Sequence, residues 1–322
     1  MAEDQRAGTA YWIDHYVVPT ADAGRFIQFY TDVFAAKPRG GDDSRPGTRF
    51  TWVGQCHVGG SPARDGKLTP GTGFPRYSWF IRKEEIAEHV ARLDALGISH
   101  SAPIQTSAEG EAGTAIRFTD PDGNPLELWA PDRMPDGAMA GETAAKVGRI
   151  AAATHESRDL ARTADFYRRY CGLDPLQGGQ LADDTLVFPL AAAGRVIFKK
   201  VDVLGNRTLG HAVYRAIHTA LVVRHDEFMP TLERMYADLP EWDFDPDHLP
   251  TLSPAEADAM APRTGMHGNP IGAEWKRTIG RADSFFDWDA NCYHFVPASP
   301  KDGSMATFNF VPQEDFLEAR RA

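Results

Sequence analysis

Three histidines stand in strand-like segments from which side chains could bind a metal ion. His15 lies in the apolar run YWIDHYVVP, His218 in IHTALVV, and His294 in CYHFV after a turn-forming stretch. Neutral imidazole binds Fe, Zn, Ni and Cu, and strands hold ligands more rigidly than loops do. A single histidine in such a run is more often a core residue bonded to a neighbour. All three, however, fall at equivalent positions of an internal repeat, which favours a shared metal site.

The repeat relates two stretches of the chain that lie 137 residues apart. His15 aligns with Ala152, so only the first copy keeps the histidine. The closing segments align at an offset of 167, which sets His294 against Glu127. An internal duplication of this length predicts a modular architecture. Five identities carry the alignment of the opening segments: Asp22, Arg25, Phe29, Tyr30 and Pro38 with Asp159, Arg162, Phe166, Tyr167 and Pro175.

Each half of the chain shows the same order of elements. A β-branched and aromatic run at 11–19 predicts a strand, and the apolar spacing of 21–36 predicts a helix after it. The strand-helix order recurs at 76–97, and AIRF and LELW flank the turn TDPDGNP as a hairpin. We therefore expect an α+β protein of two tandem domains, each made of two βαβββ modules that form cup-shaped mixed sheets.

A stretch rich in Pro, Gly and Ala separates the two halves. Residues 131–148 lack apolar periodicity and are typical of a linker. We place the boundary near its centre, with an N-terminal domain over 1–141 and a C-terminal domain over 142–322. A length of 322 residues is sufficient for two well-buried cores.

The second half carries an insertion around 238–272. The interval from His218 to His294 is longer than the corresponding interval in the first half, and the extra residues fall in this Pro-containing stretch. An insertion beside a site is a candidate lid, although a plain surface excursion is at least as common. Trp242 and Phe244 within it could wall an aromatic pocket or simply pack the insertion onto the domain.

Composition favours a small-molecule ligand. Lys and Arg total 34 against 45 Asp and Glu, and the net charge of -11 argues against nucleic-acid or anionic membrane partners. No signal peptide or membrane-length apolar run is visible, so we expect a cytoplasmic protein. Exposed strand edges favour a homodimer. Cys56, Cys171 and Cys292 form no CxxC pair, so any metal must be bound by histidine and carboxylate.

How the modules pair determines the ligands of each cup. If each domain closes its own cup, His15 joins Glu127 and His218 joins His294, and both sites are one ligand short. If module one pairs with module four, one cup receives all three histidines and the other keeps only Glu127. A three-ligand face with open positions suits Fe(II) that activates oxygen, because substrate and dioxygen must both bind. The second pairing therefore explains best where histidines survive.

Two segments resemble a known superfamily. DHYVVPTADAGRFIQFYTDVF and FTDPDGNPLELW are similar to the opening and closing of a module pair in the vicinal oxygen chelate superfamily, which includes glyoxalase I, antibiotic-resistance proteins and type I extradiol dioxygenases. The likeness covers most of 10–297, and the tandem domains resemble ring-cleaving dioxygenases, including those acting on hydroquinones. This resemblance implies His15 and His218 as ligands, with a glutamate in the family at the position of His294. A histidine there leaves the site its full +2 charge and favours anionic bidentate substrates.

These observations predict a metal-dependent dioxygenase. We expect Fe(II) and dioxygen to cleave a C–C bond of a phenolic, catecholic or hydroquinone-like chelating substrate. Zn(II) and Mn(II) are alternative ions, and three histidines with a water suit zinc equally well. A non-redox isomerase, lyase or hydrolase, and a metal-free protein that binds a drug or metabolite, stay open as alternatives.

The acid–base group is expected near module four. Tyr214 precedes the strand of His218, while His267 and Arg277 stand at the end of the insertion and shortly after it. Each could deprotonate a phenol or orient bound oxygen, and the sequence does not choose among them. Six other histidines are predicted to be structural or exposed: His57, His89, His100, His155, His225 and His248.

Overall fold

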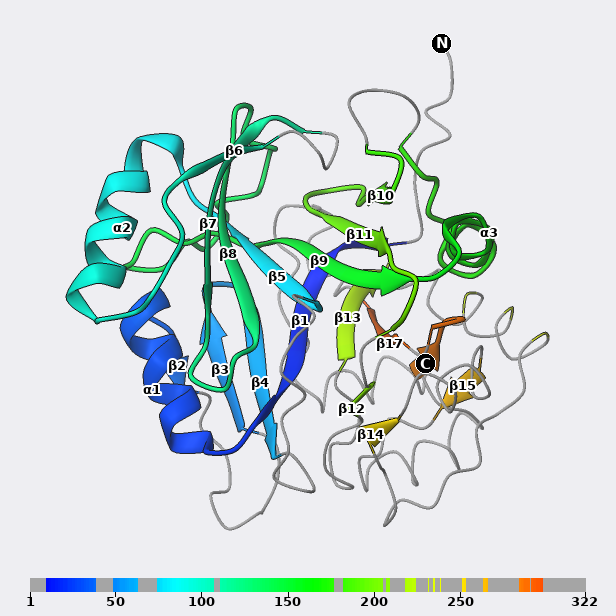
Figure 1. The fold of residues 1–322 in the computed structure, drawn as a ribbon, viewed down its shortest axis with the longest axis horizontal. Coiled ribbons are helices and arrows are strands. Elements are labelled where there is room, and N and C mark those ends of the chain that lie inside the picture. Colours follow the sequence, from blue (N-terminus) through cyan, green and yellow to red (C-terminus); the bar gives the residue numbers. More distant parts are fainter. Residues whose placement is uncertain are drawn as a thin grey trace.

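The computed structural model describes the following parts of the 322-residue chain: residues 10–38, 49–62, 74–106, 111–176, 182–204, 207–208, 218–223, 231, 234, 238, 251–252, 263–265, 284–289 and 291–297. These residues form two curled mixed sheets, with helices outside them (Figure 1). The predicted α+β class with cup-shaped sheets is confirmed. Among the described residues, no helix is long and apolar enough to cross a membrane.

The first sheet has eight strands in the order β15, β16, β17, β13, β1, β4, β3, β2. β1 lies inside it, antiparallel to β13 and parallel to β4. Figure 1 shows β1 in blue between β4 and the yellow-green β13. The strands are β1 (Ala10–Thr20), β2 (Lys37–Pro38), β3 (Arg49–Val53), β4 (Cys56–Pro62), β13 (His218–Val223), β15 (Arg263–Gly265), β16 (Ser284–Phe286) and β17 (Cys292–Pro297).

The second sheet has seven strands in the order β10, β11, β9, β5, β8, β7, β6. Its central pair, β5 and β9, is antiparallel, as β1 and β13 are in the first sheet. The strands are β5 (Arg76–Phe80), β6 (Ile104–Thr106), β7 (Gly113–Thr119), β8 (Pro125–Pro131), β9 (Ile150–Ser157), β10 (Thr185–Pro189) and β11 (Arg195–Lys200). Two further strands, β12 (Arg207–Thr208) and β14 (Thr251–Leu252), pair separately.

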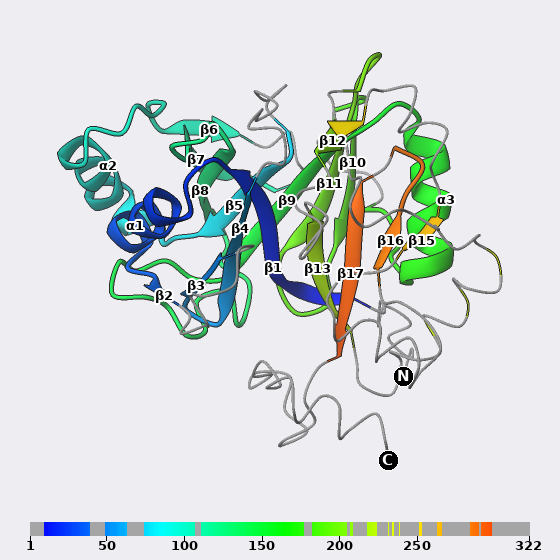
Figure 2. The same ribbon diagram turned by 90° about the horizontal axis from the view of Figure 1, so that it is seen from below.

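The strand order shows how the modules combine. The first sheet joins module one, which begins with β1, to module four, which begins with β13. The second sheet joins modules two and three through β5 and β9. Each sheet therefore takes strands from both halves of the chain, as Figure 2 shows. The predicted pairing of module one with module four is confirmed, whereas the domain boundary near residue 142 stays a prediction.

The helices begin where the repeat predicts. The equivalent residues Asp22 and Asp159 cap α1 (Ala23–Phe34) and α3 (Leu160–Cys171), and each carboxylate accepts two backbone N–H groups of the first turn. The short helix η1 (Lys83–Glu85) leads into α2 (Ile86–Ala95) in module two. The repeated aspartates are thus explained by helix capping.

One apolar core extends through both halves of the chain. It includes Ile13 of β1, Phe166 of α3 and Leu221 of β13, all of them buried. Between the sheets the rings of Tyr16 and Tyr77 stack with centroids 3.7 Å apart. Because apolar burial is the main favourable term in folding, this shared core holds the two sheets in a defined relation.

The two closing turns fasten the sheets to each other. In the turn before β8, the Asn124 amide donates to the Pro19 carbonyl at the end of β1, at 2.9 Å. In the turn before β17, Asn291 donates in the same way to the Glu156 carbonyl of β9, at 3.1 Å. The DPDGNP-type sequence therefore repeats because each copy ties one sheet to an opening strand of the other.

The predicted linker is a packed connection. Residues 131–148 join β8 to β9, and Ala138 and Val147 within them are buried. Glu142 forms an ion pair with Arg82 at 2.6 Å. Composition indicated a linker. In the structure, buried residues of this segment pack against module two, and its charged residues form ion pairs with it. The predicted insertion 238–272 lies largely outside the described residues.

Candidate metal site

The strongest candidate site lies where β1 and β13 meet. The Nε2 atoms of His15 and His218 face each other at 3.1 Å, and both residues are buried. Two nitrogens that each lie about 2.0–2.1 Å from one ion are separated by about 2.9–3.4 Å for bond angles of about 90–110°. The spacing of the two imidazoles therefore fits two ligands of a single ion. The structure brings together two histidines that are 203 residues apart in the sequence.

Asp14 fixes the orientation of the His15 ring. Its Oδ2 atom lies 2.6 Å from His15 Nδ1, a distance typical of a strong hydrogen bond. Because the carboxylate accepts, Nδ1 carries the proton, and a neutral ring then presents its Nε2 lone pair toward His218. Such a carboxylate partner is common behind metal-bound histidine. The β1 pairing is irregular between Ile13 and His15, which accounts for adjacent side chains reaching each other.

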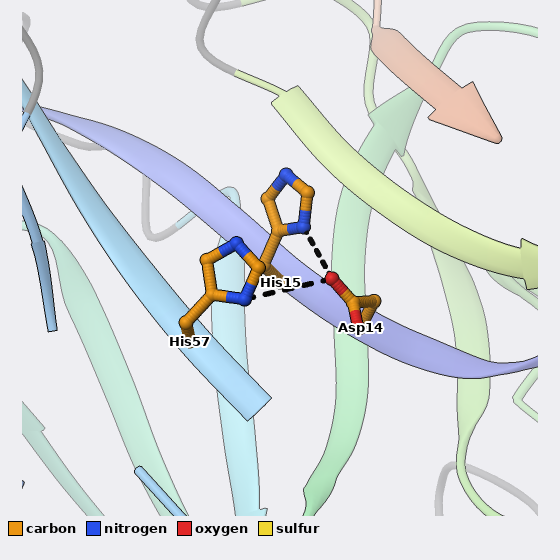
Figure 3. Close-up of side chains that lie close together, drawn as sticks. All are labelled: Asp14, His15 and His57. Carbon is orange, nitrogen blue, oxygen red and sulfur yellow. Dashed lines mark hydrogen bonds and ion pairs between the residues drawn. The ribbon is translucent and has the colours of Figure 1, made fainter. Parts of the chain in front are cut away.

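His57 adds a second imidazole from β4. Its Cα is paired with that of His15 across the parallel strands, and the two rings stack with centroids 4.1 Å apart. His57 Nδ1 lies 3.6 Å from the same Asp14 oxygen. Figure 3 shows both Nδ1 atoms directed toward Asp14, with the second nitrogen of each ring pointing away from it. Asp14 thus orients a pair of stacked histidines.

Asp14, His15 and His57 also form a compact donor set of their own. One ligand atom from each lies within 4.8 Å of the others, and all three residues are buried. The contact of 2.6 Å between Asp14 and His15 is a hydrogen bond length, shorter than the separation of two ligands on one ion. We therefore interpret Asp14 as the partner that orients the rings, and the imidazole nitrogens as the metal donors.

Aromatic side chains of β3 border the histidines. The rings of Phe50 and Trp52 lie 5.2 and 4.9 Å from the His57 ring, and both residues are partly exposed. The absence of a side chain at Gly59 leaves room for the Phe50 ring, because a Cβ at Gly59 would lie 2.6 Å from that ring. Burial raises the pKa of the neighbouring Tyr16 hydroxyl far above its usual range, so Tyr16 stays protonated at neutral pH.

The third predicted ligand lies on the adjacent strand. His294 belongs to β17, and its backbone pairs with Ala220, two residues after His218. The placement of its side chain lies outside the described part of the structure, so its role as a ligand stays a prediction. The predicted acid–base candidates Tyr214, His267 and Arg277, and the aromatic residues Trp242 and Phe244, lie outside the described residues as well.

The other sheet holds a different group of residues at the equivalent place. By strand register, Ala152 of β9 stands at the position of His15 and Arg76 of β5 at the position of His218, while Ser78 corresponds to Ala220. Glu127 of β8 is buried and accepts from Ser78 Oγ at 2.7 Å and from Arg117 Nε at 2.8 Å. Arg76 Nε lies 3.5 Å from the same carboxylate. Both oxygens of Glu127 are thus already bonded within the protein.

Sequence reasoning missed Asp14 and His57. Only register could have identified His57, because it faces His15 from a strand 42 positions later. The pairing of Ser78 with Glu127 in β5 and β8 repeats the pairing of His15 with His57 in β1 and β4. His57 therefore occupies the closing position of module one, which sequence analysis left without a residue.

Comparison with known families agrees with this fold. Residues 12–128 match the model of the Glyoxalase/Bleomycin resistance protein/Dioxygenase superfamily. Over these residues the chain is similar to this superfamily, also called the vicinal oxygen chelate superfamily. A comparison with curated protein sequences gives no match.

Solved structures extend the likeness to the whole chain. A candidate dioxygenase from Bacillus subtilis has a TM-score of 0.62 at 16% identity, covering 98% of this chain and 97% of that one. A variant of glyoxalase I from Zea mays has a TM-score of 0.60 at 15% identity, covering 98% and 97%. At these identities the similarity establishes the four-module fold and leaves the reaction open.

Proposed function

We propose that the protein is an Fe(II)-dependent dioxygenase that cleaves a C–C bond of a phenolic, catecholic or hydroquinone-like chelating substrate. The observation that carries this proposal is the pair of facing Nε2 atoms on His15 and His218, 3.1 Å apart and buried between two modules. His294 is proposed as the third ligand because its backbone lies on the neighbouring strand. Zn(II) and Mn(II) are the alternative ions.

The donor set supports a chelating, anionic substrate. Imidazole ligands are neutral, so a divalent ion held by histidines keeps its full positive charge, which favours a substrate bound through two oxygens with at least one ionised. When bound, Fe(II) supplies open coordination positions at which such a substrate and dioxygen meet. The reaction then inserts both oxygen atoms into the product and needs no outside reductant.

The neighbouring carboxylate is already engaged by the imidazole rings. Among the described residues at this cluster, Asp14 is the carboxylate, and its Oδ2 is bonded to His15 and close to His57. We therefore assign the deprotonation of the substrate to another residue, with Tyr214, His267 and Arg277 as the candidates.

The chain's own residues have separable roles in this proposal. Asp14 keeps the proton on His15 Nδ1, so that Nε2 stays a ligand atom. His57 holds the His15 ring by stacking, and Figure 3 shows its second nitrogen directed away from Asp14. Phe50 and Trp52 exclude water from the rings and offer apolar area to an aromatic substrate.

Anaerobic reconstitution tests this function. The purified chain is stripped of metal, titrated with Fe(II) without oxygen, and assayed for oxygen uptake with catechols, hydroquinones and β-diketones. We expect one Fe(II) per chain and uptake of one dioxygen per substrate consumed, with a ring- or chain-opened product by mass spectrometry. The matched control is Glu127→Gln, which changes the other sheet and should keep Fe(II) binding.

The other outcomes decide among the alternatives. Stoichiometric zinc without oxygen uptake would replace the dioxygenase by a non-redox metalloenzyme. Failure to bind any divalent ion would contradict both enzymatic functions and favour a metal-free binding protein.

A further inference from the structure

A buried arginine lies at the junction between the two halves of the chain. Arg149, which immediately precedes β9, is 2% exposed. Its Nε donates to Gln55 Oε1 at 3.2 Å, its Nη2 donates to the same oxygen, and its guanidinium lies 4.7 Å from the Trp12 ring. Among the described residues, no carboxylate lies within ion-pair distance of it. Burying a charge against neutral partners costs free energy. We therefore infer that the contact between Arg149 and Gln55 has a structural role.

The arginine's partner sits in the turn that leads to His57. Gln55 joins β3 to β4, and only Cys56 separates it from His57. Gly54 and Gly141 approach closely there, because a Cβ at Gly54 would collide with the Gly141 carbonyl oxygen. Both glycines have positive φ, of 61° and 67°. The connection between the halves, at Gly141, therefore packs directly against the β3–β4 turn at Gly54.

Further contacts run from this turn to Asp14. The Cys56 thiol donates weakly to the carbonyl of Ile13, the residue before Asp14, at 3.6 Å. Burial lowers the pKa of the Arg149 guanidinium, and the nearby charge of Asp14 acts in the opposite direction. Arg149 thus contacts Gln55 and Trp12, which stand two positions before His57 and Asp14.

We propose that the connection over residues 137–149 positions the metal site, with Arg149 as its main positioning residue. Arg149 clamps the turn at Gln55 and so keeps His57 stacked on His15 under Asp14. The segment that links the two halves thereby controls the affinity of a site on the first sheet. This inference rests on the proposed function only in requiring that the histidines bind a divalent ion.

Cobalt titration of the full-length, metal-free chain tests the proposal. Co(II) is added to the wild type and to Arg149→Gln, and binding is followed by calorimetry and by the visible absorption of the bound ion. We expect about tenfold weaker binding and a changed absorption band for Arg149→Gln, as for the loss of an outer partner of a metal ligand. Arg133→Gln, an exposed arginine between β8 and the start of this connection, is the matched control and should bind as the wild type does.

Two variants of the partner residue separate positioning from general stability. Gln55→Leu removes the acceptor and should weaken Co(II) binding as much as Arg149→Gln, whereas Gln55→Glu keeps the acceptor and should bind within about threefold of the wild type. The double variant Arg149→Gln/Gln55→Leu should be no weaker than either single one, since both remove one interaction. All titrations are run well below each variant's thermal midpoint.

The results contradict the proposal in two distinguishable ways. If Arg149→Gln and Gln55→Leu bind Co(II) as tightly as Arg133→Gln, the connection has no positioning role while the proposed function stands. If the wild type itself binds no Co(II), the proposed function fails and the positioning role fails with it.

Discussion

The two sheets place different chemistry on the same framework. In the first, the antiparallel pair β1 and β13 brings His15 and His218 together, with Asp14 behind them. In the second, the register of β5 with β9 sets Ala152 at the position of His15 and Arg76 at the position of His218. The framework therefore supplies two equivalent positions, and the pair of imidazoles lies at the one in the first sheet.

The carboxylates of the two sheets show the contrast most clearly. Asp14 is bonded to an imidazole and leaves the other ring nitrogen for a metal. Glu127 is bonded to Ser78 and to the guanidinium of Arg117. The carboxylate of Asp14 orients an imidazole that can bind a cation. The carboxylate of Glu127 is already neutralised by arginine and so does not attract a metal ion. The second sheet is stabilised by an ion pair where the first has the means to bind an ion.

Removal of a proposed ligand should have the largest effect. His218→Ala and His294→Ala should weaken divalent metal binding at least about 1000-fold, more than loss of an outer partner does. Glu127→Ala should bind metal as the wild type does, which calorimetry with Zn(II) or Co(II) measures. Retention of metal by His294→Ala together with its loss in Glu127→Ala would reverse the comparison between the sheets.

Neutralising Glu127 should affect stability and leave metal binding unchanged. Glu127→Gln leaves the buried Arg76 side chain and the half-exposed Arg117 without their shared charge. Breaking a buried pair in this way costs about 3 kcal/mol of unfolding free energy. Urea denaturation measures the change, with Ser78→Ala as a milder companion at about 1 kcal/mol. An unchanged midpoint for Glu127→Gln would show that the ion pair does not hold the second sheet.

Asp14 should act on the metal without being a ligand. Asp14→Asn weakens the hydrogen bond to His15 Nδ1, so metal affinity should fall about 10- to 100-fold, in the range of an outer partner. The fall should be smaller than that of His15→Ala in the same calorimetric titration. A loss as complete as that of His15→Ala would identify Asp14 as a direct ligand instead. Asp136→Asn, an exposed aspartate, serves as the control.

The two closing turns should respond alike to pH. Burial raises the pKa of Asp120 and of Asp287 to about 6 in each case. Because the folded-state pKa lies above the unfolded one, these groups stabilise the fold below about pH 4, and this contribution is lost as the pH rises through 6. Unfolding free energy of the metal-free protein should therefore fall by about 2–3 kcal/mol per group between pH 4 and pH 7.

Replacing the titrating groups checks this pH dependence. Asp120→Asn should remove its share of the decline, and Asp120→Asn/Asp287→Asn should remove both shares, as measured by urea denaturation across the same range. Equal slopes for the wild type and the double variant would mean that both carboxyls titrate normally.

The sequence predicted the module order, the helices that follow the opening strands and the pairing of module one with module four. Repetition made these features visible, since Asp22 with Asp159 and the two DPDGNP-type turns recur in register. His57 and Asp14 escaped prediction for physical reasons. Whether a strand residue faces a site depends on register with a distant strand and on local irregularity, and one position of register reverses the face.

Anomalous diffraction from crystals grown with Co(II) or Fe(II) would locate the bound ion. We expect one strong peak per chain, within bonding distance of the Nε2 atoms of both His15 and His218, and no peak at Glu127. An ion bound at Glu127, or an ion that contacts only one of the two histidines, would contradict a site shared between the halves.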